Sequence, residues 1–220
     1  MIWQKIAIQE DIFTEEYYKG KGFEVTNFIL ASASPRRKEL LKVMGLDFEV
    51  VVSQADESSV STDIPVSLYV QELALLKASA TAKKVLKDKN TVIISADTIV
   101  TLDGKILGKP TDKADAGRML AKLGGRTHEV YTGYCVMRIS DAKTVCSSVK
   151  TEVTFKALND EKIQSYINSG EPMDKAGAYG IQGLGSMLID GISGDYFNVV
   201  GLPVSALADT LENEFDIKVL

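Results

Sequence analysis

Histidine and cysteine are nearly absent from this chain of 220 residues, which has one histidine, His128, and two cysteines, Cys135 and Cys146. A zinc site needs about four Cys, His or carboxylate ligands at suitable spacing, and the sequence offers no such set. A Ser-His-Asp triad would have to use His128, and no G-x-S-x-G motif supplies its serine. We therefore expect His128 to begin a strand and make structural hydrogen bonds, and both cysteines to remain reduced thiols.

Long apolar runs, an excess of positive charge and internal repeats are also lacking. No stretch is long enough to span a bilayer, and the N-terminus MIWQKIAIQEDIF lacks the basic start and small-residue cleavage site of a signal peptide. Twenty-five basic and thirty acidic residues give a net charge of −5. This balance argues against binding to a nucleic-acid polymer but is compatible with a small phosphorylated ligand held by a few cations. We expect a cytoplasmic protein with neither a nucleic-acid polymer nor a membrane as partner.

Strand-like and helix-like segments alternate from residue 28 onward, whereas residues 1–27 stand apart as an N-terminal extension of unknown role. We therefore place one domain at residues 28–220. Asp103-Gly104 is typical of a hairpin turn, and long hairpins mixed with crossover helices predict an α/β protein with a mixed sheet. The predicted strands are 28–31, 48–53, 91–95, 128–139 and 144–155, and the predicted helices begin near Pro35, Pro65, Asp112, Asp160 and Pro203.

The run ILASASPRRKELL, residues 29–41, places polar residues between a short apolar strand and a helix. Proline is favoured in the first turn of a helix, where free backbone N–H groups and the positive end of the dipole bind anions. Two hydroxyl groups and two guanidinium groups at the same point suit phosphate oxygens. The alternative is a Ser-capped helix whose basic first turn is simply solvated.

A carboxylate at Asp97 interrupts the apolar segment VIISADTIV, residues 92–100, together with Thr98. Such a carboxylate is costly to bury unless it is paired or binds a metal. Asp56 and Glu57 follow the second predicted strand and could join Asp97 in a divalent-metal site. As an acidic loop alone, however, they would be unremarkable.

Lysines and glycines add further candidates. Lys77 lies within an apolar helix, where it either faces a ligand or extends its ammonium to solvent. Lys109 belongs to GKILGKP, which has too few residues between its glycines for a Walker A loop and has Pro110 in place of the metal-binding hydroxyl. The small residues of EPMDKAGAYGIQGLG, 171–185, indicate either close backbone approach to a ligand or a flexible loop. Together the candidates point to phosphoryl chemistry, with cations around an anion and carboxylates for a metal and a water.

In their order along the chain, these segments resemble the Maf family of nucleoside triphosphate pyrophosphatases, also described as septum formation inhibitor-like. The resemblance runs from about Phe28 to the C-terminus, and residues 1–27 depart from it. It implies a mixed, largely antiparallel twisted sheet with flanking helices, in two lobes around a deep cleft as in inosine triphosphatases. The matching segments are ASASPRRKELL (31–41), ADE (55–57), LALLKASA (73–80), SADTIV (95–100), GKP (108–110), GRTHEVYTG (125–133) and EPMDKAGAYGIQGLG (171–185).

The resemblance also implies an activity: hydrolysis of a nucleoside triphosphate between the α and β phosphates, giving a monophosphate and pyrophosphate. It implies Mg²⁺ or Mn²⁺ as cofactor and a homodimer as assembly. Carried over by motif, Asp97 accepts a proton from the attacking water, and Glu57 and Asp97 bind the metal. Ser32, Arg36, Arg37, Lys77 and Lys109 hold the phosphates, with Lys77 and Lys109 close to the reaction, while Arg36, Thr98 and Gln182 occupy positions linked to base selection.

Ala96-Asp97-Thr98 and Gln182 match the branch of the family that acts on dTTP and UTP. The branch that acts on 7-methyl-GTP has a different residue after the aspartate and lacks the glutamine. A glutamine amide offers one acceptor and two donors, which complements the N3–H donor and O4 acceptor of uracil or thymine. We expect a dTTP/UTP pyrophosphatase. Two alternatives remain open: a pyrophosphatase for modified purine nucleotides, and a nucleotide-binding regulator of cell division with little catalysis.

Overall fold

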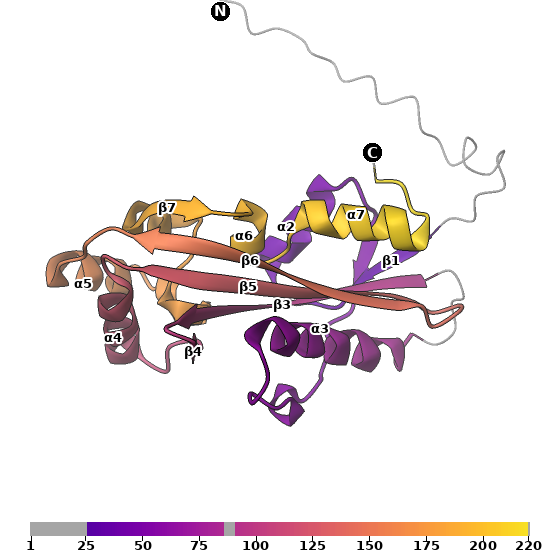
Figure 1. The fold of residues 1–220 in the computed structure, drawn as a ribbon, viewed down its shortest axis with the longest axis horizontal. Coiled ribbons are helices and arrows are strands. Elements are labelled where there is room, and N and C mark those ends of the chain that lie inside the picture. The colour runs from indigo at the N-terminus through magenta and orange to yellow at the C-terminus, as the bar shows by residue number, and fades with distance from the viewer. Residues whose placement is uncertain (1–25, 86–90, 220) are drawn as a thin grey trace, which may run out of the picture.

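The computed structural model describes residues 26–85 and 91–219 (Figure 1). All but the last two positions of the predicted N-terminal extension therefore lie outside the described residues.

One sheet runs through the whole described molecule, in the order β2-β1-β3-β5-β6-β7, with the short β4 pairing to β3 as its seventh strand. The pairings β1–β2 and β1–β3 are parallel, and the remaining pairings are antiparallel. This confirms the predicted mixed, largely antiparallel sheet. The strands are β1 (Asn27–Leu30), β2 (Phe48–Val50), β3 (Thr91–Leu102), β4 (Lys105–Leu107), β5 (Thr127–Arg138), β6 (Thr144–Phe155) and β7 (Ile189–Ser193).

Helices cover both faces of this sheet. In Figure 1, α3 lies on one face, while α2 and α7 lie on the other. Several helices begin near the predicted residues, and side chains cap them: Ser34 caps α2, Asp112 caps α4 and Asn159 caps α5 by accepting a hydrogen bond from a first-turn backbone N–H. The helices are α2 (Pro35–Val43), α3 (Val66–Ala82), α4 (Lys113–Leu123), α5 (Asp160–Asn168), α6 (Tyr196–Val200) and α7 (Val204–Phe215), with 3₁₀ turns η1 (Glu57–Ser59), η2 (Glu171–Asp174), η3 (Ala176–Ala178) and η4 (Gly183–Leu188).

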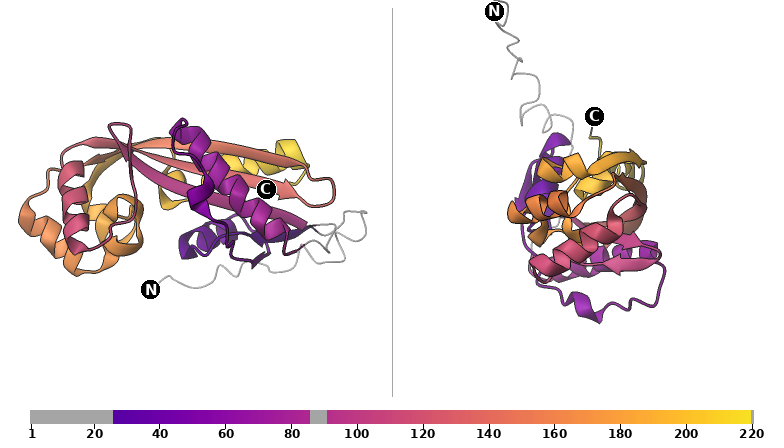
Figure 2. Two further views of the ribbon diagram at one scale, coloured as in Figure 1. Left: turned by 90° about the horizontal axis from the view of Figure 1, so that it is seen from below. Right: turned by 90° about the vertical axis from the view of Figure 1, so that its left-hand side faces the viewer.

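Two lobes share the long strands β3, β5 and β6, which connect the two ends of the elongated molecule (Figure 2). In the first lobe, α2 and α7 pack on the sheet around Leu41, Ile94 and Leu207. In the second lobe, α4 and α5 pack around Leu120 and Phe155 with the η3 region. Each lobe therefore has its own hydrophobic cluster, and a cleft can form between the two clusters.

A gap in the pairing of β3 marks the place where the lobes meet. On one edge, β1 pairs with β3 as far as Ile94, and β4 pairs with it from Val100 onward. Between these two partners, the stretch from Ser95 to Ile99 has no neighbouring strand on that edge among the described residues. Side chains there can face a ligand instead of another strand.

The structure differs from the sequence predictions in the limits of two strands and in two short elements. The predicted strand 48–53 ends at Val50, and β3 continues to Leu102 rather than stopping at Ser95. Neither β7 nor α6 is expected from the sequence. Strand β7 lies within the Gly-rich stretch 170–194 and α6 directly after it, and neither segment shows a clear strand or helix periodicity. The Asp103-Gly104 hairpin turn is confirmed, with positive φ angles of 52° and 73°.

Candidate active site

A cleft of about 950 Å³ opens between the two lobes. It is lined from the first lobe by the start of α2, by η1 and by α3, and from the second by the segment after β4 and by the loop before η4. The middle of β3 forms its floor. The structure brings together in this cleft every site residue that the family resemblance implies: Ser32, Arg36, Arg37, Glu57, Lys77, Asp97, Thr98, Lys109 and Gln182.

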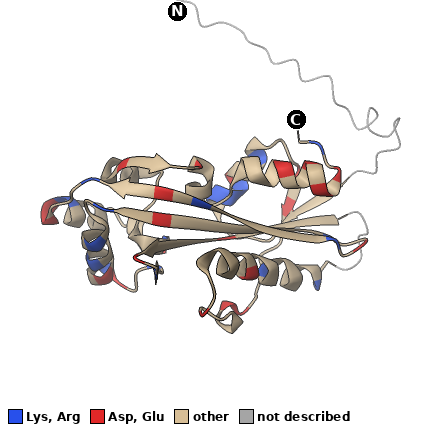
Figure 3. Cartoon of the chain, viewed as in Figure 1, with Lys and Arg blue, Asp and Glu red and all other residues tan. Residues whose placement is uncertain are grey.

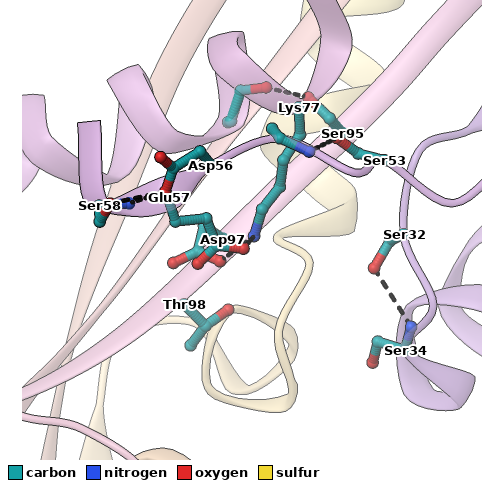
Figure 4. A network of polar contacts seen from close by, with 12 residues as sticks. Ser32, Ser34, Ser53, Asp56, Glu57, Ser58, Lys77, Ser95, Asp97 and Thr98 are labelled. Atoms are coloured by element: carbon teal, nitrogen blue, oxygen red, sulfur yellow. Dashed lines mark hydrogen bonds and ion pairs between the residues drawn. The ribbon is translucent and has the colours of Figure 1, made fainter. Parts of the chain in front are cut away.

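Lys77 joins two carboxylates at the centre of the cleft. Its Nζ lies 2.5 Å from Oδ1 of Asp97 and 3.0 Å from Oε1 of Glu57. Figure 4 shows Lys77 reaching from α3 toward both carboxylates. The side chains of Lys77 and Asp97 are 12% and 16% exposed, whereas Glu57 is 54% exposed. The ion pair explains how a carboxylate is accommodated in a strand whose flanking residues are buried.

The close approach of α3 to the sheet makes this contact possible. Asp97 pairs directly with Gly133 of β5. At Gly133 a Cβ would lie 2.7 Å from the backbone nitrogen of Gln71 and still closer to the carbonyl group of Val70, so only glycine fits under the helix. One turn farther along, the Ser95 hydroxyl donates to the carbonyl oxygen of Ala74 at 2.6 Å. These two contacts fix the distance between α3 and the sheet, and at this distance Lys77 reaches Asp97.

Arg37 is the most constrained cation of the cleft. Its Nε donates to the carbonyl oxygen of Gly201 at 2.8 Å, and its two terminal nitrogens donate to Ser32 Oγ at 3.2 Å and to Thr98 Oγ1 at 3.0 Å. Burial lowers the pKa of Arg37, and the attraction of Asp97 opposes this shift. The guanidinium group nevertheless stays charged in a protein. It therefore presents a fixed positive charge beside the N-terminus of α2.

Three candidate residues lie nearer the rim. Arg36 makes a long ion pair of 3.8 Å with Asp174, which spans the cleft from one lobe to the other. Lys109 and Gln182 are exposed, and neither side chain makes a hydrogen bond or ion pair to another described residue. Lys109 and Gln182 can therefore turn toward a bound molecule, and within the described chain Arg36 is held only by its long ion pair with Asp174.

Further polar residues of the cleft were not assigned a role from the sequence. Tyr69 lines the cleft on the same side of α3 as Leu73 and Lys77, and the spacing of four residues along the helix was the signal that could have found it. Glu171 and Lys175 line it from the second lobe. The sequence gives no signal for Glu171, because the backbone groups that it holds, those of Leu184 and Gly185, lie 13 and 14 positions farther along the chain.

A divalent metal would find two carboxylates here. Glu57 and Asp97 converge on one ammonium group, so both can approach one cation. Two carboxylates are the protein ligands that Mg²⁺ commonly uses when substrate phosphates and water complete its shell. Within residues 26–85 and 91–219, no group of three His, Cys, Asp or Glu side chains is placed to hold a metal without a substrate. Asp56 does not join the site, because its Oδ1 accepts hydrogen bonds from the backbone N–H and hydroxyl of Ser58.

The predictions for His128 and the cysteines are confirmed. His128 lies at the start of β5, and its Nε2 is 2.7 Å from the Tyr179 hydroxyl. Burial lowers the pKa of His128 to about 4. Cys135 and Cys146 are free thiols opposite each other on β5 and β6.

Positions of basic and acidic residues are interspersed along the helices and strands drawn in Figure 3. Among the described helices, none combines the length and apolar character that crossing a bilayer requires.

The family of the chain follows from its sequence. Residues 27–214 match the Maf-like protein family. The chain belongs to this family, which confirms the resemblance.

Individual relatives are similar over nearly their whole length. A dTTP/UTP pyrophosphatase of Thermoanaerobacter sp. (strain X514) is 52% identical over 192 residues, which cover 87% of this chain and 98% of that protein. A dTTP/UTP pyrophosphatase of Bacillus cereus (strain ATCC 10987) is 48% identical over 203 residues, covering 92% of this chain and 97% of that protein. Among solved structures, a nucleoside-triphosphatase / dITP/XTP pyrophosphatase from Mycobacterium abscessus has a TM-score of 0.42 at 15% identity, covering 86% of this chain and 97% of that chain.

Proposed function

We propose that this protein hydrolyses dTTP and UTP at the bond between the α and β phosphates, releasing the nucleoside monophosphate and pyrophosphate. The observation that carries the proposal is the contact of Asp97 with Lys77 in the stretch of β3 that has no described neighbouring strand on one edge, beside a helix N-terminus that carries Arg36 and Arg37. Relatives about 50% identical and named for this activity support the choice of substrate.

The phosphates of the substrate would bind at the start of α2. Free N–H groups at a helix N-terminus bind anions, and Arg37 is already oriented there by Gly201. Arg36 and Lys109 would add charge from the rim, and Ser32 a hydroxyl group. Such preorganised cations stabilise the charge that develops on the phosphoryl oxygens during transfer.

Asp97 would act as general base. It accepts a proton from a water molecule whose oxygen forms a bond to phosphorus, while the anhydride bond breaks and pyrophosphate leaves with the electron pair. Lys77 orients this carboxylate through the 2.5 Å contact and offsets its charge against the incoming phosphates.

Glu57 and Asp97 would also hold a divalent cation, Mg²⁺ or Mn²⁺. Such an ion neutralises phosphate charge when bound. Removal of the metal with EDTA should therefore abolish turnover, and added Mg²⁺ or Mn²⁺ should restore it.

Gln182 and Thr98 would select the base. Gln182 reaches the cleft from the second lobe, and its amide has no other described partner. One acceptor and two donors on this amide complement N3–H and O4 of thymine or uracil. Thr98 lies deeper in the cleft, and its hydroxyl already joins Arg37 and Thr132.

The wider context is also a proposal. We place the catalytic domain at residues 28–220, with residues 1–27 as an extension, in a cytoplasmic protein that forms a homodimer. Size-exclusion chromatography with light scattering checks the dimer directly.

The decisive experiment is pyrophosphate release from dTTP, UTP, CTP, GTP, ATP and 7-methyl-GTP with Mg²⁺ or Mn²⁺. Preference for dTTP and UTP is the expected result. Asp97→Asn should reduce turnover by at least about 10³-fold while calorimetry still detects nucleotide binding. The matched control is Asp56→Asn, which changes an exposed carboxylate outside the cleft and should keep full activity. Preference for purines would indicate the modified-purine alternative, and binding without any turnover would indicate the regulator.

A further inference from the structure

In the described chain, the loop that presents Gln182 contains short 3₁₀ turns but no α-helix or β-strand. Gln182 lies between the turns η3 and η4, and φ is positive at Gly177 (68°) and Gly183 (66°). Because the Gln182 side chain makes no hydrogen bond to a described residue, its position depends on how the backbone on either side is held.

Glu171 holds the backbone that follows Gln182. Its carboxylate accepts hydrogen bonds from the backbone N–H groups of Leu184 and Gly185, each at 3.0 Å. Partial burial raises the pKa of Glu171, but these hydrogen bonds outweigh it and leave the pKa below its usual value. The carboxylate fits closely, because a Cβ at Gly183 would lie 2.8 Å from its Oε2.

Tyr166 of α5 connects this carboxylate to the backbone that precedes Gln182. Its hydroxyl donates to Oε1 of Glu171 at 2.9 Å and accepts from the N–H of Gly180 at 3.3 Å. Lys175 completes the arrangement by donating to the carbonyl oxygen of Glu171 at 2.5 Å. Two side chains therefore hold both ends of the short segment that carries Gln182.

We propose that Glu171, supported by Tyr166, is a positioning residue that aims Gln182 at the base and thereby sets the pyrimidine selectivity of the enzyme. The inference rests on the proposed function. Neither side chain needs to touch the base. Discrimination by hydrogen bonding requires a donor and an acceptor held in register with the ligand, and a mobile amide would accept cytosine as readily as thymine.

Glu171→Gln tests the proposal because it keeps the size of the side chain but leaves one acceptor oxygen for the N–H groups of Leu184 and Gly185 and the hydroxyl of Tyr166. The measurement is kcat/KM for dTTP relative to CTP. We expect this ratio to fall about tenfold, corresponding to roughly 1.4 kcal/mol, with kcat for dTTP changed less than about threefold. Glu161→Gln, the same substitution at an exposed site on α5, should leave the ratio unchanged.

A double-mutant cycle separates positioning from general damage to the fold. In a Gln182→Ala background, Glu171→Gln should change the dTTP/CTP ratio no further, because the side chain that it positions is already gone. If Glu171→Gln does not fold, Tyr166→Phe removes the supporting hydroxyl and should shift the ratio in the same direction.

The outcomes distinguish the two proposals. A wild-type enzyme that turns over triphosphates without preferring dTTP to CTP would refute the base selection itself. A selective wild type whose ratio is unaffected by Glu171→Gln and Tyr166→Phe would overturn only the positioning role. Equal effects of Glu171→Gln with and without Gln182 would overturn it as well.

Discussion

Replacing Gly133 with alanine should separate Lys77 from Asp97 without altering either residue. Gly133 lies under α3 and pairs with Asp97 across β3 and β5. A new methyl group would lie 2.7 Å from the backbone nitrogen of Gln71, whereas ordinary contacts are 3.4–4 Å. The atoms that it meets are backbone atoms, so no side chain can turn aside. The helix must move outward by about 1 Å to restore normal separations.

That displacement has two measurable consequences. Overpacking of this kind costs about 2 kcal/mol of folding free energy, which lowers Tm by roughly 6 °C in a protein of this size. Misplacement of a catalytic contact by about 1 Å reduces kcat/KM about 100-fold. Differential scanning fluorimetry gives the first quantity, and pyrophosphate release from dTTP gives the second.

Gly191→Ala is the matched control, since this glycine lies in β7 with nothing within 4 Å of its would-be Cβ. We expect it to keep both Tm and activity. A folded Gly133→Ala variant with wild-type kcat/KM would refute the inference that tight packing of α3 on β5 places Lys77.

Two further predictions concern stability. Burial lowers the pKa of His128 to about 4 from 6.5, so between these pH values the unfolded chain binds more protons than the folded one. The free energy of unfolding should therefore fall by about 2 kcal/mol from pH 7 to pH 5. In urea titrations, the unfolding free energy of His128→Gln should depend less on pH than that of the wild type. Asn198 is fully buried, accepts from the N–H of Thr132 and donates to Val130 O and Thr151 Oγ1. Asn198→Ala should therefore lower the free energy of unfolding, measured in urea, by about 2 kcal/mol. Asn213→Ala, at an exposed site, should leave this free energy almost unchanged. Equal losses for the two variants would contradict this account.

Local signals predicted the regular parts of the fold well. The helix at 160–168 begins after the cap Asn159, and the long strands β5 and β6 lie within one residue of the predicted limits. Capping and periodicity depend on neighbours within a few residues, which explains this success. The failures, β7 and α6, lie in or beside the Gly-rich stretch, where tertiary contacts rather than periodicity set the backbone.

The candidate site residues could be chosen from the sequence because unusual chemistry stands out in an apolar context. Asp97 inside a buried strand and Arg36-Arg37 after a proline are such cases. Asp56 illustrates the limit of this reasoning: it neighbours Glu57, yet its carboxylate turns back to Ser58. Which of two adjacent acids faces the cleft depends on a local turn that composition does not reveal.

The sequence by itself determined the family of the chain, most of its elements and the identity of the polar groups available for phosphoryl chemistry. Only the tertiary structure decided how these groups meet. Among the described residues, one edge of β3 is open between Ser95 and Ile99 because β1 and β4 cover different parts of that edge. Arg37 is held by Gly201, 164 positions away, and the backbone that follows Gln182 is held by Glu171, 13 positions before Leu184. These contacts join segments that are not neighbours in the chain, so no pattern of adjacent residues encodes them.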